Sequence, residues 1–197
     1  LVNWSQDRGV RLISDEVYHG ITYEADAVSL ATLDRQAIVI NSFSKYFCMP
    51  GWRLGWMIVP SELIRPVERL AQNLFISPPT VSQYAAMASF DCYDELDACV
   101  ARYAANRSIL LEQLPNANFH HLAPADGAFY IYADISSLAD DSSKFCSEML
   151  EVTGVAVTPG IDFDPGRGKR FVRFSFSGDQ GDVQEAVQRL IRWQQDH

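Results

Sequence analysis

The sequence predicts an α/β fold, in which part of a mostly parallel sheet is followed by a smaller second α/β unit. Two apolar runs, Val10–Ile13 and Ala37–Asn41, have the composition of buried strands, and each leads into polar residues. Helical spacing begins after Pro60, and strand-like and helix-like segments alternate again after residue 126. Strands that alternate with helices are typical of α/β proteins.

A third strand, Leu54–Val59, follows the second after a short connection. Parallel neighbours need a long crossover, so this strand is expected to run antiparallel to the other two. Ser61 is then expected to cap a helix that carries one apolar stripe, Leu63, Val67, Leu70 and Leu74.

Two further helices are predicted beyond Pro78-Pro79, because consecutive prolines mark a turn. The second of them is long and reads as a connector to the rest of the chain. The apolar positions that predict the pair are Val81, Tyr84, Ala85 and Ala88, then Leu96, Val100, Tyr103 and Leu111.

The last third of the chain is expected to form the smaller α/β unit. Its predicted strands span 127–133, 155–158 and 171–176, with a helix at 144–152 and a final helix after Asp179. The segment 161–170 is rich in glycine and aspartate and is expected to be a mobile loop.

Composition excludes several classes of function. The net charge of −9 argues against a nucleic-acid partner, because phosphate backbones attract basic surfaces. No apolar run approaches the ~20 residues that cross a bilayer, so no membrane association is expected. The four cysteines show no metal-ligand spacing and indicate free thiols in a reducing cytoplasm. Asp162 and Asp164 lack the spacing of a calcium loop, so no metal is expected.

The residues after the second strand are suited to binding a phosphorylated aldehyde. Lys45 follows Ser42 and Ser44, and Arg53 lies beyond a Pro-Gly turn. A lysine amine can condense with a carbonyl, while serine hydroxyls and a guanidinium bind phosphate. Lys45 is therefore the candidate catalytic residue, and Ser42, Ser44 and Arg53 are candidate phosphate ligands.

A second cluster, Asp15 and Tyr18, follows the first strand. The carboxyl ends of parallel strands share one edge of the sheet, which is where such folds place ligands. An aspartate facing a pyridine nitrogen, together with a Schiff-base lysine, is the arrangement that binds pyridoxal 5′-phosphate. Asp15 is expected to keep the ring nitrogen protonated, and Tyr18 to donate a hydrogen bond to the ring oxygen.

With these motifs the chain resembles the fold-type I, class I/II aminotransferases. The matching segments, in the family's order, are Asp15–Tyr18, Ser42–Lys45, Gly51–Gly55, Gly127–Tyr130 and Arg173–Ser175. The resemblance implies the C-terminal part of the pyridoxal-phosphate-dependent transferase fold. It also implies that Lys45 carries the cofactor and that the complete protein is a homodimer.

Arg173 is the candidate substrate residue. A charge in the middle of an apolar strand is costly unless an anion meets it. In an extended strand Arg173 shares a face with Phe171 and Ser175, and Val172 and Phe174 lie on the other face. By resemblance, Arg173 binds the α-carboxylate of an amino acid or a 2-oxo acid.

Members of this family are about twice as long, so the 197 residues are expected to be a C-terminal half that is inactive alone. Residues 1–90 would belong to the cofactor domain, and residues 91–197 would form the interdomain helix and small domain. Two alternatives to transamination stay open. One is a carbon–sulfur β-lyase with the same cofactor, and the other is the aminotransferase-like sensor domain of a transcriptional regulator.

Overall fold

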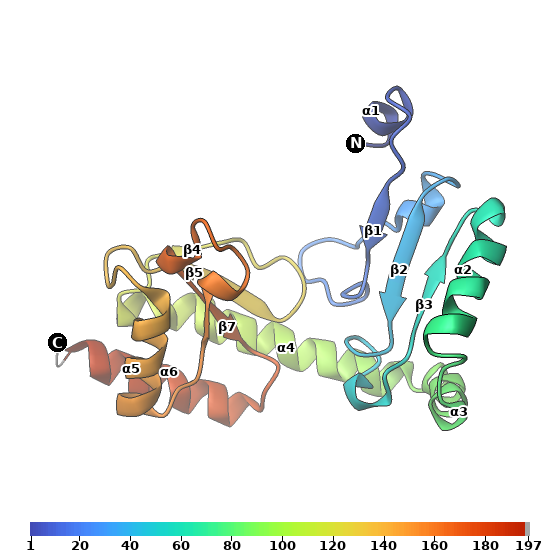
Figure 1. Cartoon of the computed structure of the whole chain (residues 1–197). Helices are drawn as coiled ribbons and strands as arrows, with labels where there is room; N and C mark the ends of the chain where they lie inside the picture. The colour runs from blue at the N-terminus through green and yellow to red at the C-terminus, as the bar shows by residue number, and fades with distance from the viewer. Residues whose placement is uncertain (196–197) are drawn as a thin grey trace. The chain divides into compact units, whose positions relative to one another are not determined.

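The computed structural model describes residues 1–195 of the chain. These residues form two compact units, one from Leu1 to Ala98 and one that begins at Cys99 (Figure 1). The long helix α4, Tyr93–Gln113, contributes residues to both units. The expected domain boundary at residues 90/91 stays a prediction.

The first unit contains a three-stranded sheet in the order β1-β2-β3, formed by Ile13–Asp15, Ile38–Ser42 and Gly55–Ile58. Strands β1 and β2 are parallel, and β3 is antiparallel to β2, as predicted. A short helix, α1 at Val2–Gln6, precedes the sheet. The predicted first strand was placed too early, because pairing with β2 begins only at Ile13.

Two further helices belong to this unit, α2 at Ser61–Leu74 and α3 at Thr80–Ser89. The predicted turn at Pro78-Pro79 separates them. The prediction that Ser61 caps α2 was wrong, since Pro60 is the capping residue and Ser61 is the first helical one. No residue of α2 is fully buried, and of its apolar stripe Leu63 and Val67 are half-buried while Leu70 and Leu74 are exposed.

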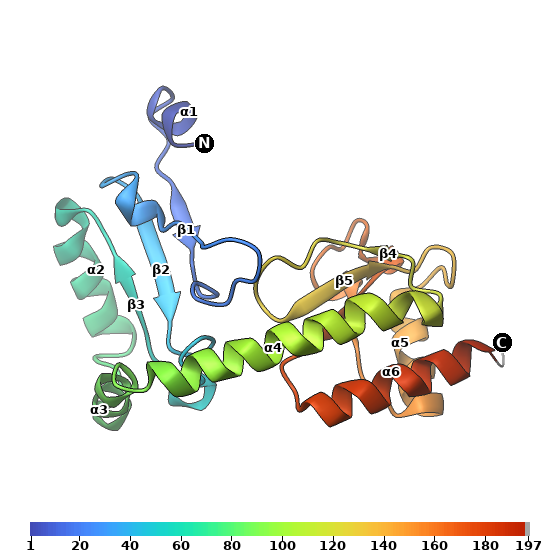
Figure 2. The same cartoon turned by 180° about the vertical axis from the view of Figure 1, so that it is seen from behind.

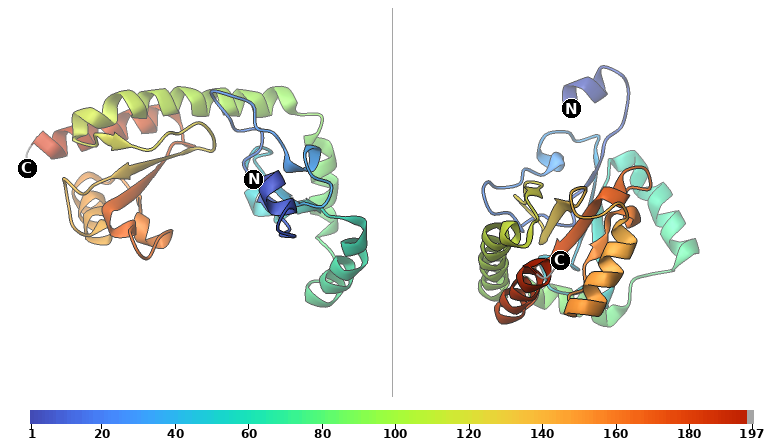
Figure 3. Two further views of the ribbon diagram at one scale, coloured as in Figure 1. Left: turned by 90° about the horizontal axis from the view of Figure 1, so that it is seen from above. Right: turned by 90° about the vertical axis from the view of Figure 1, so that its left-hand side faces the viewer.

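The second unit contains a four-stranded sheet in the order β4-β5-β7-β6. The strands are His121–Leu122, Tyr130–Asp134, Phe171–Ser175 and Thr158–Pro159. All three pairings are antiparallel. Helices α5, Ser142–Thr153, and α6, Gln180–Gln195, complete the unit. Within it, α6 lies beside α4 (Figure 2 and Figure 3).

Two predicted strands of this unit are shorter than expected. Ala128 has a left-handed backbone with φ of 58°, so extended structure begins only at Tyr130 instead of residue 127. Of the predicted strand 155–158, only Thr158 pairs with β7, together with Pro159.

The glycine-rich segment 160–170 contains short helical turns and makes close internal contacts. It contains two one-turn 3₁₀ helices, Gly160–Asp162 and Gly168–Arg170. Gly160 and Gly168 are buried against each other's backbone. The Asp164 Oδ1 accepts hydrogen bonds from the backbone N–H groups of Gly166 and Arg167, both at 3.0 Å. The segment, called the 160–170 loop below, is therefore fixed by its own packing.

Gly168→Ala in the complete protein should lower the free energy of unfolding by about 3 kcal/mol, because an added methyl group would overlap the Gly160 backbone. Chemical denaturation would measure the change. Gly178→Ala is the matched control, since no atom lies within 4 Å of a methyl group built there. Equal unfolding midpoints for the two variants would contradict the packing described for this loop.

Candidate functional site

The candidate site in the first unit lies at the carboxyl ends of β1 and β2. Asp15 is the last residue of β1, Ser42 is the last of β2, and Lys45 follows three positions later. Asp15 is level with Ile40 in the parallel pairing, so the two strands end at the same edge of the sheet. This is the edge at which open α/β sheets bind ligands.

Lys45 and Tyr18 are brought together at this edge. The Lys45 Nζ lies 5.2 Å from the centroid of the Tyr18 ring, which is within the range of a cation–π contact. Tyr18 lies in the turn that follows β1, where its carbonyl accepts a hydrogen bond from the N–H of Ile21 at 3.0 Å. Two residues that the sequence predicted for one site, 27 positions apart, are thus in contact.

Ser42 and Ser44 form a pair of adjacent hydroxyl groups. The Ser42 Oγ donates a hydrogen bond to the Ser44 Oγ at 2.9 Å and accepts one from the Ser44 N–H at 3.0 Å. Both side chains are partly accessible. Because the Ser42 hydroxyl and the Ser44 N–H donate within the pair, the Ser44 hydroxyl is the group of the pair that can donate to an anion such as phosphate.

The turn after Lys45 carries two residues in the left-handed region, Cys48 with φ of 54° and Arg53 with φ of 52°. The Arg53 Nη1 donates a hydrogen bond to the Pro50 carbonyl at 2.9 Å, and the rest of its side chain is exposed. The exposed guanidinium can reach an anionic ligand.

A small apolar cluster packs against this turn. Phe43, Met49 and Ala86 are buried together, and the Phe43 ring lies 4.9 Å from the rings of both Phe47 and Trp56. The N–H of Met49 donates to the Phe43 carbonyl at 3.0 Å, which closes the turn around Lys45. Packing on both sides of Lys45 therefore fixes the backbone that carries it.

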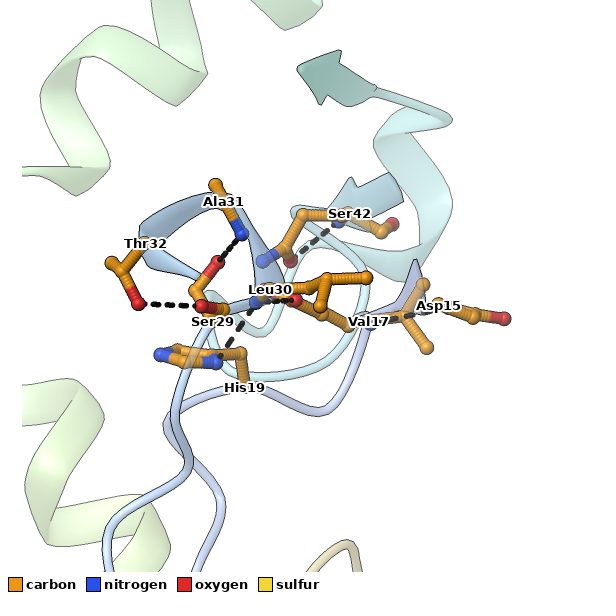
Figure 4. Close-up of polar contacts among 10 residues, drawn as sticks. Asp15, Val17, His19, Ser29, Leu30, Ala31, Thr32 and Ser42 are labelled. Carbon is orange, nitrogen blue, oxygen red and sulfur yellow. Dashed lines mark hydrogen bonds and ion pairs between the residues drawn. The ribbon is translucent and has the colours of Figure 1, made fainter. Parts of the chain in front are cut away.

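Asp15 has a local backbone contact in addition to its predicted role. Its Oδ1 accepts a hydrogen bond from the N–H of Val17 at 3.2 Å (Figure 4). Its side chain is exposed at the sheet edge. One carboxylate oxygen thus fixes the turn toward Tyr18, and the second is available to a ligand.

Glu16, next to Asp15, has a structural role. Its Oε1 accepts a hydrogen bond from the N–H of Leu30 at 2.7 Å, which ties the 3₁₀ turn Leu30–Thr32 to the end of β1. Ser29 caps the same turn (Figure 4). Burial acts to raise the pKa of the Glu16 carboxyl, but the hydrogen bonds from Leu30, Ser29 and Ser14 outweigh it and lower that pKa.

Sequence reasoning missed the contact between Tyr46 and Asp97. The Tyr46 hydroxyl donates a hydrogen bond to the Asp97 Oδ1 at 2.6 Å, which links the residue after Lys45 to the first turns of α4. Burial and then this hydrogen bond raise the pKa of Tyr46. No sequence pattern signals a pair 51 residues apart.

Arg173 lies in the second unit, on β7, and its guanidinium is close to two aromatic rings. Its Cζ is 4.0 Å from the ring centroid of Tyr130 and 4.2 Å from that of Phe163. Val172 and Phe174 are buried on the opposite face of the strand, which confirms the predicted orientation. Among residues 1–195, the buried Nε of Arg173 has no hydrogen-bond partner.

Metal-binding clusters and membrane-spanning helices are both absent from residues 1–195. Residues 1–195 contain no group of three or more histidine, cysteine, aspartate or glutamate side chains arranged to hold a metal ion. Over the same residues, none of the helices combines the length and the apolar character of a membrane span.

Comparison of the chain with known proteins identifies the family to which it belongs. The family model for aminotransferase class I and II matches residues 1–190. The chain is 51% identical to the valine–pyruvate aminotransferase of Mycobacterium tuberculosis, over 98% of the chain and 51% of that protein. It is 30% identical to an aspartate aminotransferase of Sulfurisphaera tokodaii, over 96% of the chain and 49% of that protein.

A solved structure gives the same result. The crystal structure of an aminotransferase from Mycobacterium tuberculosis superposes with a TM-score of 0.95 at 50% identity, over 99% of this chain and 51% of that one. The α/β fold of the chain is therefore that of part of an aminotransferase. The chain spans about half the length of the curated relatives it matches.

Proposed function

Because the chain belongs to the class I and II aminotransferase family, we propose that the complete protein is a pyridoxal-phosphate-dependent aminotransferase. It moves an amino group between an α-amino acid and a 2-oxo acid. The observation that carries this proposal is the contact between the Lys45 amine and the Tyr18 ring, 5.2 Å apart, at the edge where Asp15 and Ser42 end their strands.

The residues at this edge fit pyridoxal 5′-phosphate. Ser42 and Ser44 hold adjacent hydroxyls 2.9 Å apart, and the Arg53 guanidinium is exposed nearby in sequence, which together suits a phosphate dianion. Asp15 would face the ring nitrogen, and Tyr18 would donate to the ring oxygen. When bound, the cofactor supplies a carbonyl that takes up amino groups and a ring that accepts electrons.

Each of these side chains then has a separate task. Lys45 would hold the cofactor, and its Nζ, as a free amine, would take the proton from the substrate Cα. The negative charge of Asp15 would keep a proton on the ring nitrogen. The apolar packing of Phe43 and Met49 fixes the turn that carries Lys45, and so limits the positions that the amine can occupy.

Arg173 binds the carboxylate that all substrates of this reaction share. Its Nε is buried without a hydrogen-bond partner among residues 1–195, and such a donor is stabilised when an acceptor arrives. A guanidinium fork matches the two oxygens of a carboxylate. The amino acid and the 2-oxo acid can therefore use the same residue.

The relative with 51% identity supports a narrower proposal on substrates. That protein is named a valine–pyruvate aminotransferase, and we assign an aliphatic amino acid such as valine as donor and pyruvate as acceptor. Family membership also supports a homodimer in the cytoplasm, with residues 1–90 in the cofactor domain and residues 91–197 in the connecting helix and small domain.

Purified complete protein with bound cofactor should convert valine and pyruvate into alanine and 3-methyl-2-oxobutanoate in equal amounts. Amino-acid analysis and 2-oxo acid chromatography would measure both products. A panel of other amino acids, aspartate included, is the comparison. A preference for aspartate would contradict the substrate assignment alone. No amino-group transfer from any member of the panel would contradict the proposed function.

A further inference from the structure

Two aromatic rings lie against the guanidinium of Arg173. The Tyr130 ring, from β5, lies 4.0 Å from the Arg173 Cζ, and the Phe163 ring, from the 160–170 loop, lies 4.2 Å from the same atom. A guanidinium that lies over the face of an aromatic ring is held there by cation–π attraction. A ligand can then meet Arg173 through the N–H groups, which lie in the plane of the guanidinium.

The ring of Phe163 is held by the construction of its loop. Phe163 directly follows the turn Gly160–Asp162, and its N–H donates to the Gly160 carbonyl at 2.9 Å. At Gly160 an added methyl group would lie 2.6 Å from the Gly168 carbonyl oxygen. The backbone at the start of the loop is therefore in direct contact with the backbone near its end. The Ser142 Oγ donates to the Gly168 carbonyl at 3.0 Å and fixes the loop to α5.

Tyr130 approaches from the sheet itself. It lies on β5, which pairs with β7 so that Tyr130 is opposite Ser175 and Tyr132 is opposite Arg173. Tyr130 is therefore a diagonal neighbour of Arg173 on one face of the sheet, at a separation that aromatic and long side chains can bridge. One ring comes from a strand and the other from a loop, so both are independent of the arginine's own rotamer.

The ring pair has an energetic consequence for a binding arginine. A long side chain that must be immobilised on binding loses rotamer freedom at that moment, and a pre-oriented one does not. The cation–π contacts also stabilise the charge before an anion is present. The Nε of Arg173 is buried and has no hydrogen-bond partner among residues 1–195, so this one donor is already withdrawn from water.

We propose that Phe163 and Tyr130 are positioning residues that hold the Arg173 guanidinium edge-on toward the carboxylate shared by both substrates. This inference rests on the proposed function, because it takes the carboxylate of an amino acid or 2-oxo acid as the ligand of Arg173. The rings act through Arg173 and touch no reacting atom. They set the affinity for the carboxylate and leave the chemical step unchanged.

The test is made in the complete protein with bound cofactor, using leucine in place of each ring. Phe163→Leu and Tyr130→Leu keep an apolar side chain but remove the aromatic face. Each should raise the KM for the amino acid and for the 2-oxo acid by the same factor, about three- to tenfold, from the loss of one cation–π contact. The kcat should stay within about twofold.

Three further variants make the test specific. Phe163→Tyr and Tyr130→Phe keep the rings and should have wild-type KM values. Phe171→Leu is the matched control on the same strand as Arg173, because the Phe171 ring stacks on Tyr132, with centroids 4.9 Å apart and planes 8° apart, and not on Arg173. It should leave the KM unchanged.

A binding measurement separates this inference from the proposed function. Isothermal titration calorimetry with 3-methylbutanoate, a carboxylate that has no amino or oxo group, needs no turnover. The leucine variants should bind it about three- to tenfold more weakly than the wild type. Unchanged binding in both leucine variants of a protein that transaminates would overturn the inference alone. Absence of turnover in the wild type, with binding weakened in the variants, would overturn the function and support the positioning.

Discussion

Lys45→Ala in the complete protein should lower kcat for transamination by about 10²- to 10⁴-fold, the range that a positioned proton-transfer group contributes. The amine that holds the cofactor carbonyl and the amine that takes the Cα proton are the same atom in the proposed function, so both tasks are lost together. Stopped-flow and steady-state assays with valine would measure the loss. Borohydride reduction followed by peptide mass spectrometry would identify the modified lysine in the wild type.

The chain supplies matched controls for this experiment. Its other two lysines are Lys144, in α5, and Lys169, in the 160–170 loop. Lys144→Ala and Lys169→Ala should retain wild-type kcat and a reducible cofactor adduct. If the adduct persisted at full level in Lys45→Ala and disappeared in one of the other two variants, the site would have been assigned to the wrong lysine.

Arg173→Lys should lower kcat/KM for every amino acid by about one to two decades. Lysine keeps the positive charge but loses the two-pronged geometry and the contacts with the rings of Tyr130 and Phe163. Charge-assisted hydrogen bonds of this kind contribute about 1.5–3 kcal/mol. Steady-state kinetics with an amino-acid panel, together with a cofactor titration, would show whether the loss is confined to substrate.

Asp15→Asn provides the contrast, because Asp15 is proposed to act on the ring nitrogen. This variant should keep the wild-type KM for the substrate and have a lower kcat. Arg173→Lys should instead keep the wild-type affinity for the cofactor and have a higher KM for the substrate. If Arg173→Lys left kcat/KM within about twofold and weakened cofactor retention instead, Arg173 would belong to the cofactor side.

The parts of the fold and site that follow from local patterns were predictable from the sequence. The residues before Asn41 are β-branched and form a strand, which is followed by hydroxyl residues and Lys45. Because the neighbouring strand is parallel and ends in Asp15, Asp15 and Lys45 must lie at the same edge of the sheet. The antiparallel direction of β3 followed from the short connection alone. These features depend on residues that are close in sequence or on the geometry of neighbouring strands.

The parts that depend on distant contacts were not predictable. Phe163 lies in a glycine- and aspartate-rich segment that reads as a loop, and nothing in that composition places its ring on Arg173. The hydrogen bond between Tyr46 and Asp97 joins residues 51 positions apart. The late start of β5 depends on the positive φ of Ala128, and alanine carries no sequence signal for that conformation.

At the turn after Lys45, which contains the left-handed residues Cys48 and Arg53, the substitutions that favour stability and those that favour activity differ. Each such non-glycine residue carries strain on the order of 1–2 kcal/mol, which the Phe43 and Met49 packing must offset. Glycine would relax the backbone at either position, but at Arg53 it would also delete the proposed phosphate ligand. A search for thermostable variants guided by backbone preference alone would therefore favour glycine at both positions and, at Arg53, would remove the proposed phosphate ligand.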